Sequence, residues 1–268
     1  MSEYKTESEI IEILKSLDLS SYPIKDVEKY IVAFSQIMPI VITILPPGKI
    51  IIRGRNYNNK ENFTLPCSHS YPHKNLVTKC QRANLPGSNM FYGAVNTVSS
   101  SQDDPCARIG IITEIGKSIR DNAAKETIVF SSWVVVRELK LVTIFQAHHY
   151  SRPNNCLMEI ENSFENLFGK KDGYYFADYI ASEFSKPVKD GEDFNYLISA
   201  VFSNLVCQQH HYDGIYYPGV QIGGAVMNVA IKPDSVNRCL KLVGAGEFNF
   251  VREGMNIKEE SHRMITLA

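Results

Sequence analysis

The chain is organised around the stretch Gln81-Arg82-Ala83-Asn84-Leu85-Pro86-Gly87-Ser88-Asn89-Met90-Phe91-Tyr92. Its Pro-Gly pair predicts a tight turn, and its apolar end predicts the start of a strand. The turn would hold Arg82 close to Tyr92. A guanidinium group is a planar fork that fits a phosphate, and a phenol ring can stack on a flat ligand. On this stretch alone, a surface arginine beside a half-buried tyrosine is the favoured interpretation, and only the rest of the chain raises the functional one.

Length and composition set broad limits. The 268 residues are enough for one large domain or two small ones, and the net charge of −1 provides no basic field for nucleic acid or anionic membrane. The N-terminus is polar and lacks an apolar signal core. The longest apolar run, residues 37–45, is too short to span a membrane and contains Pro39. Six irregularly spaced cysteines predict free thiols, and we therefore expect a cytoplasmic protein.

Hydrophobic periodicity predicts the order of the elements. Helical spacing over residues 7–17 and 26–38, the second with Asp26 as N-cap, predicts an N-terminal helical extension over residues 1–45. Residues 46–268 are expected to form one mixed α/β domain. Its further predicted helices are 155–184, interrupted at 169–173, and 194–208. Its predicted strands are 49–55, 107–115, 127–138, 139–145, one each within 210–220 and 221–231, and two short ones within 239–251. Residues 96–105, rich in Ser and Asp, are expected to form an exposed loop.

Two arginines close the first strand of this domain. Arg53 and Arg55 are two residues apart, so both side chains should face the same side of the strand. Like charges on one face repel each other unless an anion lies between them. The pair therefore indicates either an anion-binding site or a solvated strand end.

A carboxylate stands near the end of the predicted strand 107–115. Glu114 has apolar neighbours, and an unpaired buried charge is costly. This residue should therefore either meet a Lys or Arg in a salt bridge or act on a ligand.

Metal binding has one weak candidate. Cys67, His69, His73 and Cys80 could together hold zinc tetrahedrally, but their spacing differs from the common finger and ribbon patterns. Polar loop residues without a metal are the alternative, and we expect no metal. His148 and His149 end a predicted strand, where adjacent side chains point to opposite sides, so they should be a poor metal pair.

Several separated motifs form an ordered set. An early strand ends in Arg53, and R-A-N-x-P-G-x4-Y follows from Arg82 to Tyr92. A predicted strand then ends in Glu114, and D-G-I-x-Y-P-G and G-G-x3-N-V come late in the chain. Over residues 46–233 this set resembles the RES-domain family, named for an Arg, a Glu and a Ser. The resemblance implies a mixed α+β fold like that of ADP-ribosyltransferases. That fold has a central split sheet with flanking helices.

The resemblance also implies a site for NAD⁺ as substrate. Its expected catalytic residues are Glu114, Arg82 and Tyr92. The residues expected to bind NAD⁺ are Arg53, Arg55, Asn84, Tyr217, Gly219 and Asn228. The family's Ser should follow the Y-P pair, where this chain has Gly219. That departure implies a substituted hydroxyl, an altered reaction or binding without catalysis.

The function implied by the resemblance is cleavage of the nicotinamide–ribose bond by phosphorolysis or hydrolysis. Several members of the family are toxins of toxin–antitoxin pairs. The expected partners are therefore NAD⁺, inorganic phosphate and an antitoxin protein, with neither nucleic acid nor membrane.

Three alternatives remain open at this point. One is an ADP-ribosyltransferase acting on a macromolecule, and another is a non-catalytic NAD⁺- or nucleotide-binding protein. The third is a thiol hydrolase that uses Cys207 with His210 or His211, which lie at helical spacing from it.

Overall fold

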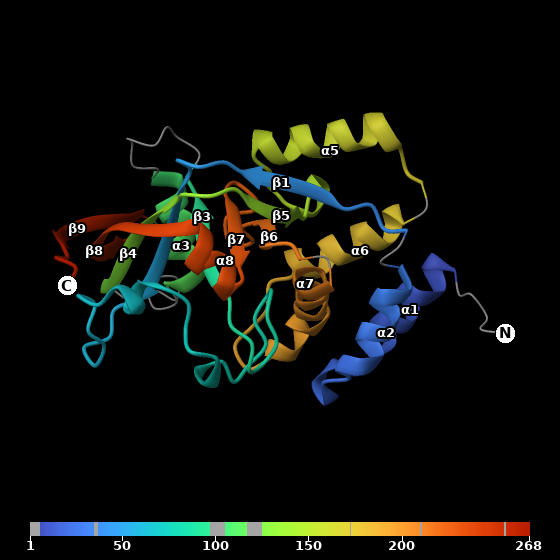
Figure 1. The fold of residues 1–268 in the computed structure, drawn as a ribbon, viewed down its shortest axis with the longest axis horizontal. Helices are drawn as coiled ribbons and strands as arrows, with labels where there is room; N and C mark the ends of the chain where they lie inside the picture. The colour runs from blue at the N-terminus through green and yellow to red at the C-terminus, as the bar shows by residue number, and fades with distance from the viewer. Residues whose placement is uncertain are drawn as a thin grey trace.

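A computed structural model describes residues 6–34, 37–96, 105–116, 125–171, 173–209, 211–254 and 256–268. These residues form a mixed sheet with helices on both of its faces (Figure 1). The predicted α+β class is confirmed. The strands are β1 (Val41–Leu45), β2 (Ile50–Asn56), β3 (Phe91–Val95), β4 (Lys125–Val135), β5 (Leu139–Thr143), β6 (Gly214–Pro218), β7 (Met227–Ile231), β8 (Leu240–Glu253) and β9 (Asn256–Met264). The helices are α1 (Glu7–Ser16), α2 (Ile24–Phe34), α3 (Pro105–Ile115), α5 (Asn155–Phe168), α6 (Tyr174–Ser185), α7 (Leu197–Gln209) and α8 (Pro233–Cys239).

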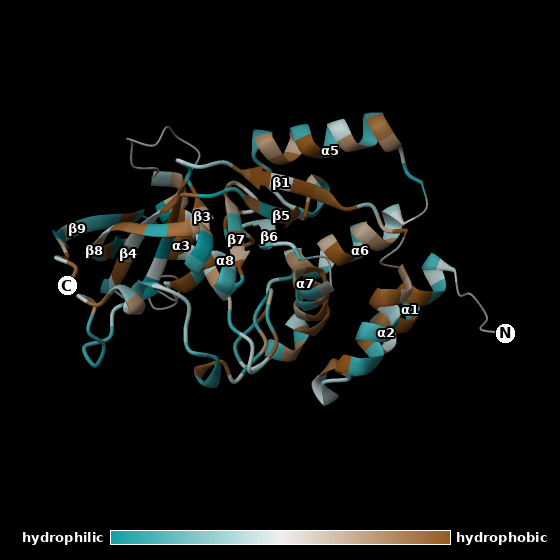
Figure 2. Cartoon of the chain, in the orientation of Figure 1, coloured by the Kyte–Doolittle hydropathy of each residue, from teal (hydrophilic) through white to brown (hydrophobic). Residues whose placement is uncertain are grey.

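The sheet has the strand order β1-β5-β6-β7-β3-β2-β4-β8-β9, and only β5 and β6 pair in parallel. Its two edges differ in character (Figure 2). β1 is apolar, with Ile42 and Ile44 exposed, whereas β9 is polar and exposed along its whole length. Within the described ranges, no helix combines the length and the apolar character needed to cross a bilayer.

Alternating side chains divide the core between the two faces of the sheet. Val142 and Ile215 pack with α1, α2, α6 and α7, whereas Leu141 and Tyr216 pack on the opposite face with α5 and α8. The face that carries α6 and α7 also carries α3, farther along the sheet over β2, β4 and β8. The two helical groups therefore cover different halves of the same face.

The shortest strand pairing in the sheet is the one between β2 and β3. These strands pair at only two positions, Ile51 with Val95 and Ile52 with Ala94. Beyond them β2 continues only with β4, and β3 continues only with β7. The Arg53 guanidinium spans the separating strands by donating a hydrogen bond to the Tyr92 carbonyl oxygen over 2.8 Å. The sheet is thus opened at its centre, between the halves covered by the two helical groups.

The prediction of a strand over residues 107–115 is wrong, because this segment lies within α3. Four β-branched isoleucines favoured a strand, and apolar residues on several sides of the helix hid its period. α3 lies close against β2 at Gly54, where an added Cβ would come within 2.2 Å of Ile111 Cγ2. This close approach brings Glu114, at the end of α3, to the opening in the sheet.

The two ends of the chain also differ from expectation. Residues 239–251 do not hold two short strands, since one long β8 pairs with β9 after the short helix α8. β9 was missed because its charged residues show no apolar alternation. Helices α1 and α2 both form, but α2 begins at Ile24, so Asp26 lies in its first turn and is not the expected N-cap. Residues 41–45 are strand β1, which pairs with β5. Residues 97–104 of the expected exposed loop lie outside the described residues.

Candidate functional site

A cavity of about 360 Å³ lies where β2 and β3 separate. Its walls come from β2, β3, β6, β7, α3 and the R-A-N turn. The lining residues are Arg53, Gly54, Gln81, Arg82, Tyr92, Gly93, Ile111, Glu114, Ile115, Tyr196, Tyr217 and Asn228. Six of the nine residues expected in the NAD⁺ site therefore line one cavity of a size that suits a small ligand.

Arg53 places a buried positive charge in the wall of the cavity. Its side chain is only 9% exposed and lies over the Phe91 ring, 5.2 Å from the centroid. Burial, with a smaller contribution from nearby Arg55, lowers its pKa from 12.5 to about 10. Its Nε has no hydrogen-bond partner among the described residues. A buried cation with an unused donor is suited to an anionic ligand.

Arg55 does not line the cavity, contrary to expectation. Its guanidinium forms an ion pair with Glu61, donates to the Ser68 carbonyl oxygen and lies over the Phe63 ring. The positive charge is therefore already neutralised within the loop that follows β2. Only one of the two strand-end arginines is available to a ligand in the cavity.

Glu114 is held by the loop that follows β6. Its Oε1 accepts hydrogen bonds from the backbone N–H of Val220 at 3.0 Å and of Gln221 at 3.4 Å. Among the residues described, no protein group bonds to Oε2. The carboxylate is thus oriented by two backbone dipoles while one oxygen remains available. The expected salt bridge does not form within the described residues, where the partners of Glu114 are backbone N–H groups and not a Lys or Arg.

Arg82 lines the cavity, but both terminal nitrogens of its guanidinium bond to the backbone. It donates to the carbonyl oxygens of Phe184 and Lys186, at and just beyond the C-terminus of α6. It also lies over the Tyr196 ring, 5.0 Å from the centroid. Unpaired carbonyls at a helix C-terminus favour a cation, so Arg82 anchors α6 to the R-A-N turn.

Tyr92 and Asn84 hold that turn in shape. The Tyr92 hydroxyl donates to Asn84 Oδ1 at 2.6 Å and accepts from the Ala83 backbone N–H at 3.1 Å. Asn84 lies outside the cavity, and its Nδ2 donates to the Leu85 and Ser88 carbonyl oxygens. Burial raises the pKa of Tyr92. Its hydroxyl is therefore committed to the turn, and only its ring is available to a ligand.

A Tyr92→Phe substitution tests this structural role. It would leave the Asn84 Oδ1 acceptor and the Ala83 N–H donor without their partner, which should lower the free energy of unfolding by about 1–3 kcal/mol. Urea denaturation followed by circular dichroism measures the change. Tyr71→Phe is the control, because the Tyr71 hydroxyl bonds Asn237 at an exposed position and should cost under about 0.5 kcal/mol. Equal losses in both variants would contradict the assigned role.

The late motif supplies Tyr217 and Asn228 to the cavity, but not Gly219. Gly219 lies just behind the wall and accepts a backbone hydrogen bond from Gly224. An added Cβ there would lie 3.2 Å from Asn228 Nδ2. A serine at this position would thus displace Asn228 slightly, and Gly219 leaves that amide room beside the cavity.

Some residues of the site were not expected. Tyr196 and Gln81 line the cavity, and Ile111 and Ile115 give it an apolar wall. Tyr150 lies behind the site with a buried hydroxyl that bonds to no described residue. Burial raises its pKa, and the nearby charges of Arg82 and Glu114 act on it in opposite directions. Tyr196 carries no sequence signal, whereas Gln81 directly precedes the R-A-N motif.

The alternative chemical sites do not assemble as expected. Cys67, His69, His73 and Cys80 form no metal-binding group within the described parts of the chain. His69 is buried with its Nε2 at the Phe63 carbonyl oxygen, which accounts for it without a metal. Burial raises the pKa of the Cys207 thiol to about 12, which disfavours the reactive thiolate. Of its two expected partners, His210 lies outside the described residues, and His211 is exposed beyond the end of α7 with a left-handed φ of 57°.

The expectation that His148 and His149 point to opposite sides is wrong. β5 ends at Thr143, and both histidines lie in a 3₁₀ turn, η4 (Ala147–His149). Their rings lie side by side, with centroids 4.2 Å apart. Alternation applies to a strand and not to such a turn, so both side chains reach the same neighbour.

No family model, no curated protein and no solved structure matches this chain.

Proposed function

We propose that this protein binds NAD⁺ in the cavity between β2 and β3 and cleaves its nicotinamide–ribose bond. The observation that carries the proposal is the meeting of Arg53, Glu114 and Tyr92 in one cavity from three distant parts of the chain. The cation has an unused donor, the carboxylate has an unbonded oxygen, and the aromatic ring lies between them and the R-A-N turn. These are the groups that a dinucleotide with a reactive ribose requires.

The chemistry assigns a role to each group. Breaking the N-glycosidic bond places positive charge on the ribose, and the Glu114 carboxylate can stabilise that charge or orient the attacking molecule. Arg53 binds the pyrophosphate and thereby positions the ribose. The tyrosine rings of the cavity stack on the nicotinamide. Nicotinamide leaves as a neutral molecule, so the reaction needs little help from a general acid.

The test follows NAD⁺ over time with purified protein, with and without inorganic phosphate. Hydrolysis yields nicotinamide and ADP-ribose, whereas phosphorolysis yields nicotinamide and ADP-ribose phosphorylated at its anomeric carbon. Calorimetric titration with NAD⁺ measures binding independently of turnover. Binding without turnover would favour the non-catalytic alternative, for which the observation is Gly219 in place of the family's Ser. Neither binding nor turnover would overturn the proposal.

Transfer of ADP-ribose to a macromolecule uses the same site and is separated by its product. Incubation with labelled NAD⁺ and a cell extract would place the label on protein or nucleic acid. Under our proposal, the label stays in small molecules. The resemblance extends the proposal to a toxin neutralised by a protein partner. All six cysteines are free, which supports a reducing compartment such as the cytoplasm.

Arg53→Met and Arg55→Met form a matched pair that tests where the anion binds. Arg53→Met should weaken ADP-ribose binding at least about tenfold, because charged hydrogen bonds contribute roughly 1.5–3 kcal/mol. Arg55→Met should leave binding unchanged, since Arg55 is outside the cavity and paired with Glu61. Calorimetric titration measures both affinities. Equal affinities would show that the buried guanidinium does not contact the ligand.

A further inference from the structure

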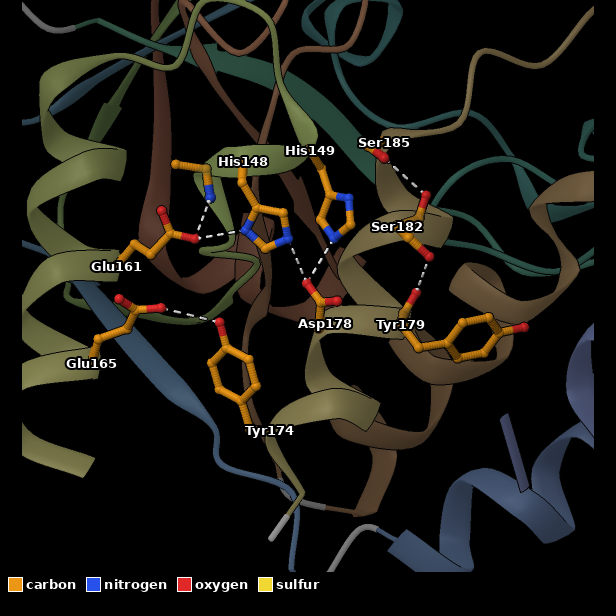
Figure 3. A network of polar contacts seen from close by, with 10 residues as sticks. His148, His149, Glu161, Glu165, Tyr174, Asp178, Tyr179, Ser182 and Ser185 are labelled. Carbon is orange, nitrogen blue, oxygen red and sulfur yellow. Dashed lines mark hydrogen bonds and ion pairs between the residues drawn. The ribbon is translucent and has the colours of Figure 1, made fainter. Parts of the chain in front are cut away.

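A second group of side chains lies on η4, α5 and α6, away from the cavity (Figure 3). His148 Nε2 lies 2.9 Å and His149 Nε2 lies 2.8 Å from the same oxygen, Asp178 Oδ1. The three ligand-capable atoms lie within 4.8 Å of one another. This group shares no residue with the cavity wall, so it does not depend on the proposed NAD⁺ site.

Neutral His148 would direct a lone pair at the Asp178 carboxylate. The Nδ1 of His148 lies 3.0 Å from Glu161 Oε1, and an Nδ1–H that donates to this oxygen leaves the Nε2 lone pair facing Asp178. Two imidazole nitrogens and a carboxylate oxygen then converge on one point. Positive charge is required there, and either protons or a metal ion can supply it.

The position of Glu161 favours a metal ion over protons as the source of this positive charge. Its Oε1 also accepts the Ala147 backbone N–H at 3.0 Å, which fixes the carboxylate beside the first histidine. Histidines that bind metals almost always donate their other ring N–H to such a carboxylate or carbonyl group. Glu161 is largely buried, and Asp178 lies opposite it across His148, as Figure 3 shows. The arrangement fixes both the tautomer and the direction of the ring.

We propose that His148, His149 and Asp178 bind one divalent first-row transition metal ion of the zinc class. Two imidazoles and one carboxylate are a donor set used by such ions, and imidazole nitrogen excludes calcium and magnesium as the preferred occupants. The His148 side chain is 52% exposed, so the remaining positions on the metal open to water. The ion ties the end of the β5 connection to α6, and through Glu161 to α5.

Cobalt and zinc are the probes. Titration of the metal-free full chain with Co²⁺ should produce visible ligand-field bands that saturate at one equivalent and disappear when Zn²⁺ is added. His149→Ala and the nearly isosteric Asp178→Asn should each weaken binding at least tenfold. His262→Ala is the matched control, because His262 lies on exposed β9, away from the cluster, where it pairs with Glu259 and stacks on Phe248. This variant should bind Co²⁺ like the parent protein. Circular dichroism establishes that each variant is folded.

Glu161→Gln tests the support of His148. It keeps an oxygen for the Ala147 N–H but removes the charge, and metal affinity should fall about 10–100-fold. Three results would overturn the proposal: no saturable band, equal binding in all variants, or a cobalt–thiolate charge-transfer band. The third would assign the metal to exposed cysteines such as Cys67, Cys106 or Cys156. Absence of binding would mean that protons alone hold the cluster together.

Discussion

Glu114→Gln should lower the turnover number for NAD⁺ cleavage by about 10²–10³-fold while changing the Michaelis constant little. Glutamine keeps an Oε1 that accepts the N–H groups of Val220 and Gln221, so the loop after β6 stays in place. What is lost is the negative charge on the oxygen that faces the cavity. Removing one electrostatic stabiliser of a transition state typically costs rate by this factor, or about 2.7–4 kcal/mol.

Glu114→Gln removes the charge of the side chain but keeps the oxygen that holds the loop after β6. Glu114→Ala would remove the acceptor for two backbone N–H groups as well, so a loss of activity could reflect a displaced loop. Glu138→Gln is the control, because Glu138 is exposed in the turn between β4 and β5 and makes no contact with the cavity. Both variants are assayed for nicotinamide release at saturating NAD⁺. A Glu114→Gln enzyme within a few-fold of the parent would remove Glu114 from the reaction.

Much of the sheet could be predicted from the sequence, because most strands are short apolar runs between turn residues. β2 and β6 follow this rule, and their motifs placed Arg53 and Tyr217 in one cavity as expected. Arg55 could not be excluded on that basis. Its ion pair with Glu61 depends on the path of a polar loop, which no periodicity describes.

Glu114 lines the cavity with the other expected residues, although the element that carries it was predicted wrongly. The apolar residues of α3 contact β2, β3, β4 and the loop before β7, so the helix has no polar face to reveal its period. The close approach of α3 to β2 at Gly54 brings Glu114 to the cavity. What the sequence could not show is the partner of Glu114, because the loop amides at Val220 and Gln221 are backbone groups that any residue carries.

The Asp of D-G-I-x-Y-P-G should prove to be a structural residue, with Asp213→Ala lowering the free energy of unfolding by about 3 kcal/mol. Asp213 is buried and does not line the cavity. Its Oδ2 accepts the Lys140 backbone N–H at 2.8 Å, and its Oδ1 accepts from the Ser235 hydroxyl and pairs with Arg238. It thereby joins the starts of β5 and β6 to α8.

Alanine at position 213 would leave these buried donors without an acceptor, and removing one partner of a buried ion pair typically costs about 3–5 kcal/mol. The lower figure applies because the Arg238 side chain is half exposed and can turn to water. Asp234→Ala, at an exposed position in the first turn of α8, should cost under about 1 kcal/mol. Urea denaturation measures both losses, and NAD⁺ titration of the folded variants should give the parent affinity. Weakened binding with unchanged stability would instead place Asp213 in the ligand site, and the late motif would then act through its acid as well as through Tyr217 and Asn228.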